Sequence, residues 1–252
     1  MSYGQFCPVS KAAEIFATRW TPLILRELML GSTRFNDIHR GLPLISRTLL
    51  AQRLRELERA GVVRAERRPR GHDWLLTEAG DAFRPMVEGL HLWGRRWGRG
   101  LPTQDDMDPR LLMWDIHRKV RLDRVPPGRH VLRFHFKGLP RQFTAVRRVW
   151  LVLTPADADV CHQDPGYPVT LGVEVDVGLM CRLWMGYEAW EEALRRSAVQ
   201  FDGDREAARL LPDWLDLAER RARADDHLPL TPAPPRATDR PVSALSPAEA
   251  PA

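Results

Sequence analysis

The feature that most constrains the fold is a helix–turn–helix pattern that leads directly into a basic hairpin. Ser46 is a typical N-cap residue and Gly61 a typical helix stop, so the run between them is predicted to be a helix. At about 100° per residue its leucines share one face, which is predicted to meet a core: Leu50, Leu54 and Leu57, with Leu49 beside them. A shorter helical segment, 34–40, precedes it across the turn 41–43.

The opposite face of the second helix carries side chains that can read DNA. Arg47 projects from its first turn, and the polar face holds Thr48, Gln52, Arg55 and Arg59. Glutamine can pair with an adenine edge, arginine with guanine, and threonine with a phosphate or a thymine methyl. The same pattern also fits the solvated face of any amphipathic helix, so the helix alone leaves both interpretations open.

The segment after Gly61 has the pattern of a basic wing. Residues 62–63 and 74–76 can pair as strands around the turn 69–71. The hairpin is rich in cationic side chains: Arg64, Arg67, Arg68, Arg70 and His72. Residues 1–100 contain 17 Lys and Arg against 10 Asp and Glu, which leaves 21 against 23 for the other 152 residues. This imbalance predicts that the first hundred residues bind a polyanion.

Several linked motifs, in the same order, resemble the HxlR-type regulators of bacteria. The matching stretches are Cys7-Pro8-Val9, RWTPLILREL at 19–28, RFNDIHRGLP at 34–43, ISRTLLAQRLRELERAGVV at 45–63 and LLTEAG at 75–80, with Trp93 and Trp97 further on. The resemblance covers about residues 5–97 and implies a homodimeric winged helix that binds a palindromic operator in double-stranded DNA. One departure is Trp74, where the family usually has tyrosine. The predicted DNA contacts are Arg34, Ser46, Arg47, Thr48, Gln52, Arg55, Arg67, Arg68 and Arg70.

Two further features of this region are candidates for function. Apolar residues recur at helical spacing over 77–97 and fit either a cover for the module's own core or a dimer contact. The family dimerises there, so the predicted dimer residues are Phe83, Leu90, Trp93 and Trp97. Cys7 occupies the place where some relatives sense oxidants, which makes it a candidate redox sensor. The alternative is that Cys7 has no sensing role.

The rest of the chain predicts an α+β domain over 109–222, joined by a linker at 101–108 and followed by a disordered tail at 223–252. Apolar and polar residues alternate in 131–137 and 169–176, as in half-buried strands, and helices are expected at 177–196 and 204–222. The spacing over 168–215 resembles the sterol carrier protein type 2 fold, which implies an apolar cavity. Its candidate lining residues, which fit ordinary core packing equally well, are Met180, Leu183, Trp184 and Met185.

The sequence also excludes several classes of function. The three cysteines are far apart without a CxxC pair, so neither a disulfide framework nor a structural zinc site is expected. We find no catalytic signature, no cofactor motif and no membrane span, and we expect a cytoplasmic protein. The leading hypothesis is a DNA-binding regulator whose C-terminal domain senses an apolar small molecule. The alternatives are a lipid carrier or enzyme with an accessory DNA-binding domain, and a C-terminal domain that only extends the dimer.

Overall fold

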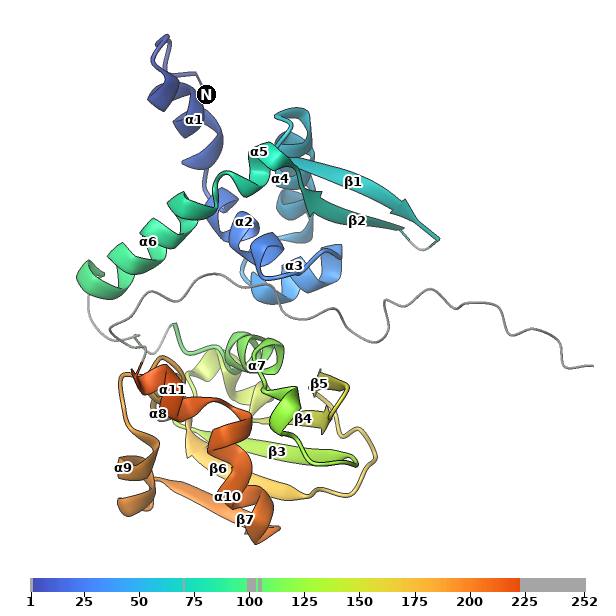
Figure 1. Cartoon of the computed structure of the whole chain (residues 1–252), viewed down its shortest axis with the longest axis vertical. Coiled ribbons are helices and arrows are strands. Elements are labelled where there is room, and N and C mark those ends of the chain that lie inside the picture. Colours follow the sequence, from blue (N-terminus) through green and yellow to red (C-terminus); the bar gives the residue numbers. More distant parts are fainter. Residues whose placement is uncertain (1, 70, 99–102, 104–105, 223–252) are drawn as a thin grey trace, which may run out of the picture.

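The structure is a computed structural model of the 252-residue chain, and it describes residues 2–69, 71–98, 103 and 106–222 (Figure 1). Arg70, most of the predicted linker and the whole predicted tail lie outside the described residues. The buried apolar side chains form two separate clusters, one before residue 98 and one after residue 106. We call residues 2–98 the N-terminal unit and residues 106–222 the C-terminal unit.

The N-terminal unit consists of six helices and one hairpin among its described residues. The helices are α1 (Pro8–Phe16), α2 (Thr21–Met29), α3 (Phe35–Gly41), α4 (Arg47–Arg59), α5 (Glu78–Asp81) and α6 (Arg84–Trp97). Strands β1 (Val63–Arg68) and β2 (Gly71–Leu76) pair in antiparallel fashion between α4 and α5. The predicted helix–turn–helix and wing are therefore confirmed.

Local chemistry explains where α4 begins and ends. The Ser46 hydroxyl accepts a hydrogen bond from the backbone N–H of Leu49 at 3.2 Å, which satisfies one of the free donors of the first turn. Gly61 has a φ of 71°, a left-handed conformation that glycine adopts without steric cost. Leu50, Leu54 and Leu57 are buried against the core of the N-terminal unit. The amphipathic pattern thus fixes which face of α4 remains available to a ligand.

The helix predicted over 77–97 is instead two helices, α5 and α6. Proline lacks the backbone N–H that an α-helix uses, so it is tolerated only in the first turn. Pro85 occupies that position in α6, and Phe83 is the residue before the helix. The break gives α6 its own direction away from α5 (Figure 1).

The C-terminal unit is a mixed five-stranded sheet with helices. Its strands are β3 (His130–Lys137), β4 (Arg148–Thr154), β5 (Asp157–Cys161), β6 (Leu171–Asp176) and β7 (Val199–Gly203). The strand order is β5-β4-β3-β6-β7, with β3 and β6 parallel and the other pairs antiparallel. The helices are α7 (Pro109–Arg118), α8 (Val177–Trp184), α9 (Trp190–Arg195), α10 (Arg205–Trp214) and α11 (Leu217–Ala222), with short 3-10 turns at Leu122–Arg124 and Arg141–Val146.

Each of the two helical segments predicted for this unit consists of two helices. The segment 177–196 divides into α8 and α9 at Gly186, which has a φ of 74°. The segment 204–222 divides into α10 and α11 near Asp216, which also lies in the left-handed region at 58°. Helix α7 begins after Asp108, whose carboxylate caps it by accepting a hydrogen bond from the N–H of Arg110 at 2.9 Å.

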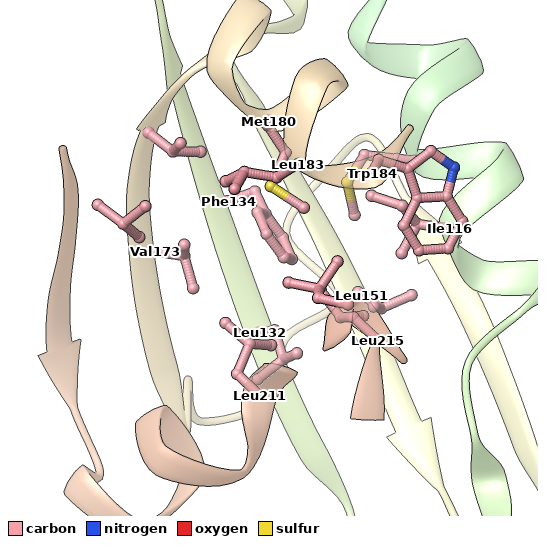
Figure 2. Close-up of a cluster of buried hydrophobic side chains, with 14 of the residues drawn as sticks. Ile116, Leu132, Phe134, Leu151, Val173, Met180, Leu183, Trp184, Leu211 and Leu215 are labelled. Atoms are coloured by element: carbon pink, nitrogen blue, oxygen red, sulfur yellow. The ribbon is translucent and has the colours of Figure 1, made fainter. Parts of the chain in front are cut away.

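The core of the C-terminal unit lies between one face of the sheet and helices α7, α8 and α10. Figure 2 shows side chains from these elements converging on Phe134 and Leu151. Three of the four candidate pocket residues, Met180, Leu183 and Trp184, belong to this buried cluster, and Met185 is half-buried. The structure thus places them where ordinary core packing would, and a ligand cavity among them stays a prediction.

The two units meet through a buried ion pair. Glu27 of α2 is fully buried, and its Oε2 accepts a hydrogen bond from Nη1 of Arg118 of α7 at 2.7 Å. Arg118 also bonds Asp115, which accepts from Nε1 of Trp184 at 2.8 Å and from Nζ of Lys119 at 2.9 Å. Burial alone would raise the pKa of Asp115, but Lys119 and Arg118 hold it well below its ordinary value. A continuous polar chain therefore connects α2 to α8.

Candidate nucleic-acid interface

The start of α4 presents an exposed polar face with one arginine held in place. Nη2 of Arg47 donates to Oδ1 of Asn36 at 2.7 Å, and its guanidinium lies 5.1 Å from the centre of the Phe35 ring. Both partners belong to the first turn of α3. The helix before the turn therefore orients the first side chain of the helix after it. Neither Asn36 nor Phe35 could be predicted from the sequence, because a contact between two separate helices has no local signal.

The other predicted reading residues on α4 are exposed. Thr48 and Arg55 are exposed, and Ser46 is held by its capping role. Nε2 of Gln52 donates to Oε1 of Glu56 at 2.9 Å. This bond, together with that from Arg53, lowers the pKa of Glu56. Glu56 therefore competes with a base edge for one N–H of the Gln52 amide.

The wing carries less free positive charge than its arginine count suggests. Nε of Arg68 donates to Oδ2 of Asp73 at 3.0 Å, and Arg64 pairs with Glu66 at 3.5 Å. Arg67 is exposed on β1, in register with His72 of β2.

The base of the hairpin is attached to the start of α3. Nε of Arg34 lies 4.0 Å from Oδ1 of Asp73, and the N–H of Trp74 donates to the carbonyl of Thr33 at 2.8 Å. Trp74 also packs against the core of the unit. These contacts hold the wing to the helix–turn–helix, so that the two predicted DNA-contacting surfaces form one body. Whether each predicted residue contacts DNA stays a prediction.

The apolar stripe of α6 divides between the core and the surface. Phe83 stacks on Phe16 with ring centres 5.2 Å apart and packs on the unit's own core, which is the alternative that the spacing left open. Leu90, Trp93 and Trp97 are instead 49%, 62% and 61% exposed. Met86 of the same helix is exposed as well, and so are Phe6 and Val9 of the N-terminal segment, which the dimer prediction also assigned to the interface.

The three cysteines are free thiols. Cys7 is half-buried at the N-cap of α1, and the nearby Lys11 ammonium pairs with Glu14 at 3.3 Å. Burial raises the pKa of Cys181 to about 11, which makes it a poor nucleophile. Redox sensing by Cys7 stays a prediction. The part of the chain that the structure describes contains no cluster of metal-ligating side chains and no helix long and apolar enough to cross a membrane.

Comparison with known proteins assigns the N-terminal unit to a family. The family model described as HxlR-like helix-turn-helix matches residues 15–101. The HTH-type transcriptional regulator YvaP of Bacillus subtilis is 36% identical over 101 residues, which cover 38% of this chain and 94% of YvaP. The chain belongs to the HxlR-like helix-turn-helix family. Relatives of this kind are named as transcriptional regulators, so this HxlR-type chain is a DNA-binding regulator and not an enzyme.

A second curated relative of the HxlR-type chain agrees with this assignment. The regulator Rv3095 of Mycobacterium tuberculosis is 33% identical over 132 residues, which cover 47% of this chain and 83% of the relative. Among solved structures, the reduced form of the transcriptional regulator YodB from B. subtilis is 31% identical, with a TM-score of 0.33 and coverage of 38% of this chain and 97% of YodB. The family match ends at residue 101, so the sheet of the C-terminal unit lies outside it.

Proposed function

We propose that this HxlR-type regulator binds a palindromic operator as a homodimer, with α4 in the major groove and the wing along the DNA backbone. The observation that carries the proposal is the exposed start of α4, where Arg47 is fixed by Asn36 beside the exposed Thr48. A side chain oriented before binding loses less conformational entropy when it contacts a base. The neighbouring Arg55 and Arg67 are exposed and suited to base or phosphate contacts.

The exposed stripe of α6 supports the dimer. Leu90, Trp93 and Trp97 lie on one side of the helix, and large aromatic side chains of this exposure are typical of protein interfaces. A twofold axis through this stripe would relate two α4 helices. Half-sites one DNA turn apart require a separation of about 34 Å or a multiple of it.

We also propose that the chain is divided into two domains. Two separate hydrophobic clusters support a DNA-binding domain over 1–100 and a second domain over 109–222. The order β6, α8, α9, β7 and α10, with Gly203-Asp204 before the last helix, is the pattern on which the sterol-carrier resemblance was based. This order supports a sterol-carrier-like second domain. Release of apolar compounds from the purified protein would support a cavity in it.

Selection of bound fragments from random DNA tests the proposed function. We expect one palindromic motif, bound by the wild-type dimer in a gel-shift titration. Gln52→Ala should weaken the selected operator by about 1–3 kcal/mol and relax one base position. Arg67→Ala should weaken selected and random DNA equally, because phosphate contacts carry no sequence information. If Gln52→Ala weakened both DNAs equally, α4 would not be the reading helix.

A further inference from the structure

A small cleft opens where the two units meet. It lies between α3, α7 and the end of β5, with a volume of about 190 Å³, and α7 runs directly beneath α3 in Figure 1. The N-terminal unit contributes the side chains of α3 and the following turn, and the C-terminal unit contributes the rest. The lining residues are His39, Arg40 and Pro43 on one side, and Arg110, Trp114, Val160 and His162 on the other.

The lining of the cleft is rich in basic side chains. Its lining contains two arginines and two histidines but no carboxylate. Asp108 occupies the Nε–Nη2 edge of Arg110, and Asp37 accepts from Nη1 of Arg40. Nη1 of Arg110 and Nη2 of Arg40 have no hydrogen-bond partner among the described residues and remain available for a ligand.

The two arginines of the cleft also influence the pKa of His162. Burial lowers the pKa of His162, and the charges of Arg110 and Arg40 lower it further. Both guanidinium groups therefore lie close enough to His162 to affect it, although they belong to different units. An anion between them would be attracted by both guanidinium groups, each of which already pairs with one carboxylate, Asp37 or Asp108.

One wall of the cleft is aromatic. Trp114 is almost fully buried, and the Arg40 guanidinium lies 5.3 Å from the centre of its ring. Drug-sized ligands occupy pockets of about 300–1,000 Å³, so a ligand of this cleft is smaller. We propose that the cleft binds a small aromatic carboxylate, with its acid group between Arg40 and Arg110 and its ring beside Trp114.

The cleft is connected to the start of the reading helix. Nε2 of His39 lies 3.0 Å from the carbonyl oxygen of Ile45, the residue before the Ser46 cap of α4. Pro43 belongs to the turn between α3 and α4 and also lines the cleft. An occupant therefore contacts the turn that sets the direction of α4. This coupling, which rests on the proposed function, makes the carboxylate a regulator of operator affinity.

Binding is tested on the full chain with benzoate, and with benzyl alcohol as a neutral compound of matched size. Calorimetric titration should give saturable benzoate binding with a Kd at or below about 1 mM, and binding of benzyl alcohol at least tenfold weaker. Arg40→Gln and Arg110→Gln should each weaken benzoate at least tenfold. Arg129→Gln, whose guanidinium lies 4.0 Å from the Tyr167 ring outside the cleft, is the matched control and should bind as wild type.

Three results would overturn the site. The first is absence of saturable benzoate binding, the second is equal binding of benzyl alcohol, and the third is displacement of benzoate by equimolar inorganic phosphate. The comparison of benzoate with benzyl alcohol uses wild-type protein, so it remains decisive if an arginine variant fails to fold. A loss in Arg129→Gln equal to that in Arg40→Gln would also refute the assignment.

The coupling is tested separately from DNA binding itself. Saturating benzoate should change the affinity for the selected operator at least fivefold, and operator DNA should change benzoate affinity by the same factor. A chain that binds operator with unchanged affinity in benzoate would refute the coupling and leave the proposed function intact. A chain that binds benzoate but no DNA would instead refute the proposed function.

Discussion

The buried ion pair between Glu27 and Arg118 should couple the stabilities of the two units. Glu27 is fully buried and Arg118 is 7% exposed, with Oε2 and Nη1 2.7 Å apart. Two unit charges at that distance attract by about 6 kcal/mol at an effective dielectric constant of 20, before desolvation is subtracted. Removal of one partner of such a pair leaves the other charge buried, which typically costs about 3–5 kcal/mol.

The expected loss for Arg118→Met lies at the lower end of that range, at about 3 kcal/mol. Glu27 keeps two other partners, because Nη2 of Arg26 lies 2.7 Å from Oε1 and the Ser32 hydroxyl lies 3.4 Å from Oε2. Asp115 keeps its bonds from Lys119 and Trp184. The side chain of methionine replaces much of the buried aliphatic stem of arginine, so the loss reports mainly on charge.

A double-mutant cycle in urea measures the pair directly. Glu27→Gln, Arg118→Met and the double variant should give a coupling energy of about 2 kcal/mol in the free energy of unfolding. The control cycle uses Glu206 and Arg209, an exposed pair on α10 that should show little measurable coupling. A Glu27–Arg118 coupling energy below about 0.5 kcal/mol would refute the argument that this contact binds the units together.

Three further outcomes follow from the structure. Leu90→Asp combined with Trp93→Asp should give a monomer in sedimentation and abolish operator binding, whereas Leu194→Asp, at another exposed leucine, should leave the oligomeric state unchanged; a stable dimer in the double variant would exclude α6 as the interface. The slope of log affinity against log salt should lie between about −5 and −9 for a dimer with 6–10 phosphate contacts, and a slope near zero would contradict electrostatic binding. The pKa values of His91 and His162 are lowered, first by burial and then by nearby cations, so the unfolded chain binds more protons. The free energy of unfolding should therefore fall as the pH is lowered from 7 to 5.5, and an equally steep fall in the His91→Gln, His162→Gln double variant would show that other groups are responsible.

Local patterns were sufficient to predict the helix–turn–helix and the wing. The periodicity of Leu50, Leu54 and Leu57, the cap at Ser46 and the turn chemistry at 69–71 act within a few residues of each other, and β1, β2 and α4 follow them. Phe83 shows the limit of such patterns. Its spacing fitted both a core contact and a dimer contact, and the stacking on Phe16 of another helix is a contact that no local signal reports.

The C-terminal unit was harder to predict. The alternation in 131–137 and 169–176 indicated β3 and β6, but β5 was missed because Asp157 and Asp159 interrupt its apolar pattern. This strand lies at the edge of the sheet. An edge strand pairs with only one neighbour and can leave one face partly exposed, so it does not need a regular apolar pattern. The interface between the units was missed for another reason. The ion pair of Glu27 with Arg118 joins residues that are far apart in the chain, and each residue alone looks like an ordinary surface charge.

The parallel pairing of β3 with β6 has a consequence for the order in which the chain folds. The segment after β5 must return from one edge of the sheet to the other side of β3 before β6 can pair, and such non-local closure is slow. The helices and hairpin of the N-terminal unit pair mostly with near neighbours in the chain, and this unit leaves the ribosome first. A nascent chain therefore completes its helix–turn–helix before the five-stranded sheet of the C-terminal unit has formed. The cleft beside Trp114 comes into existence only after the C-terminal unit has also folded.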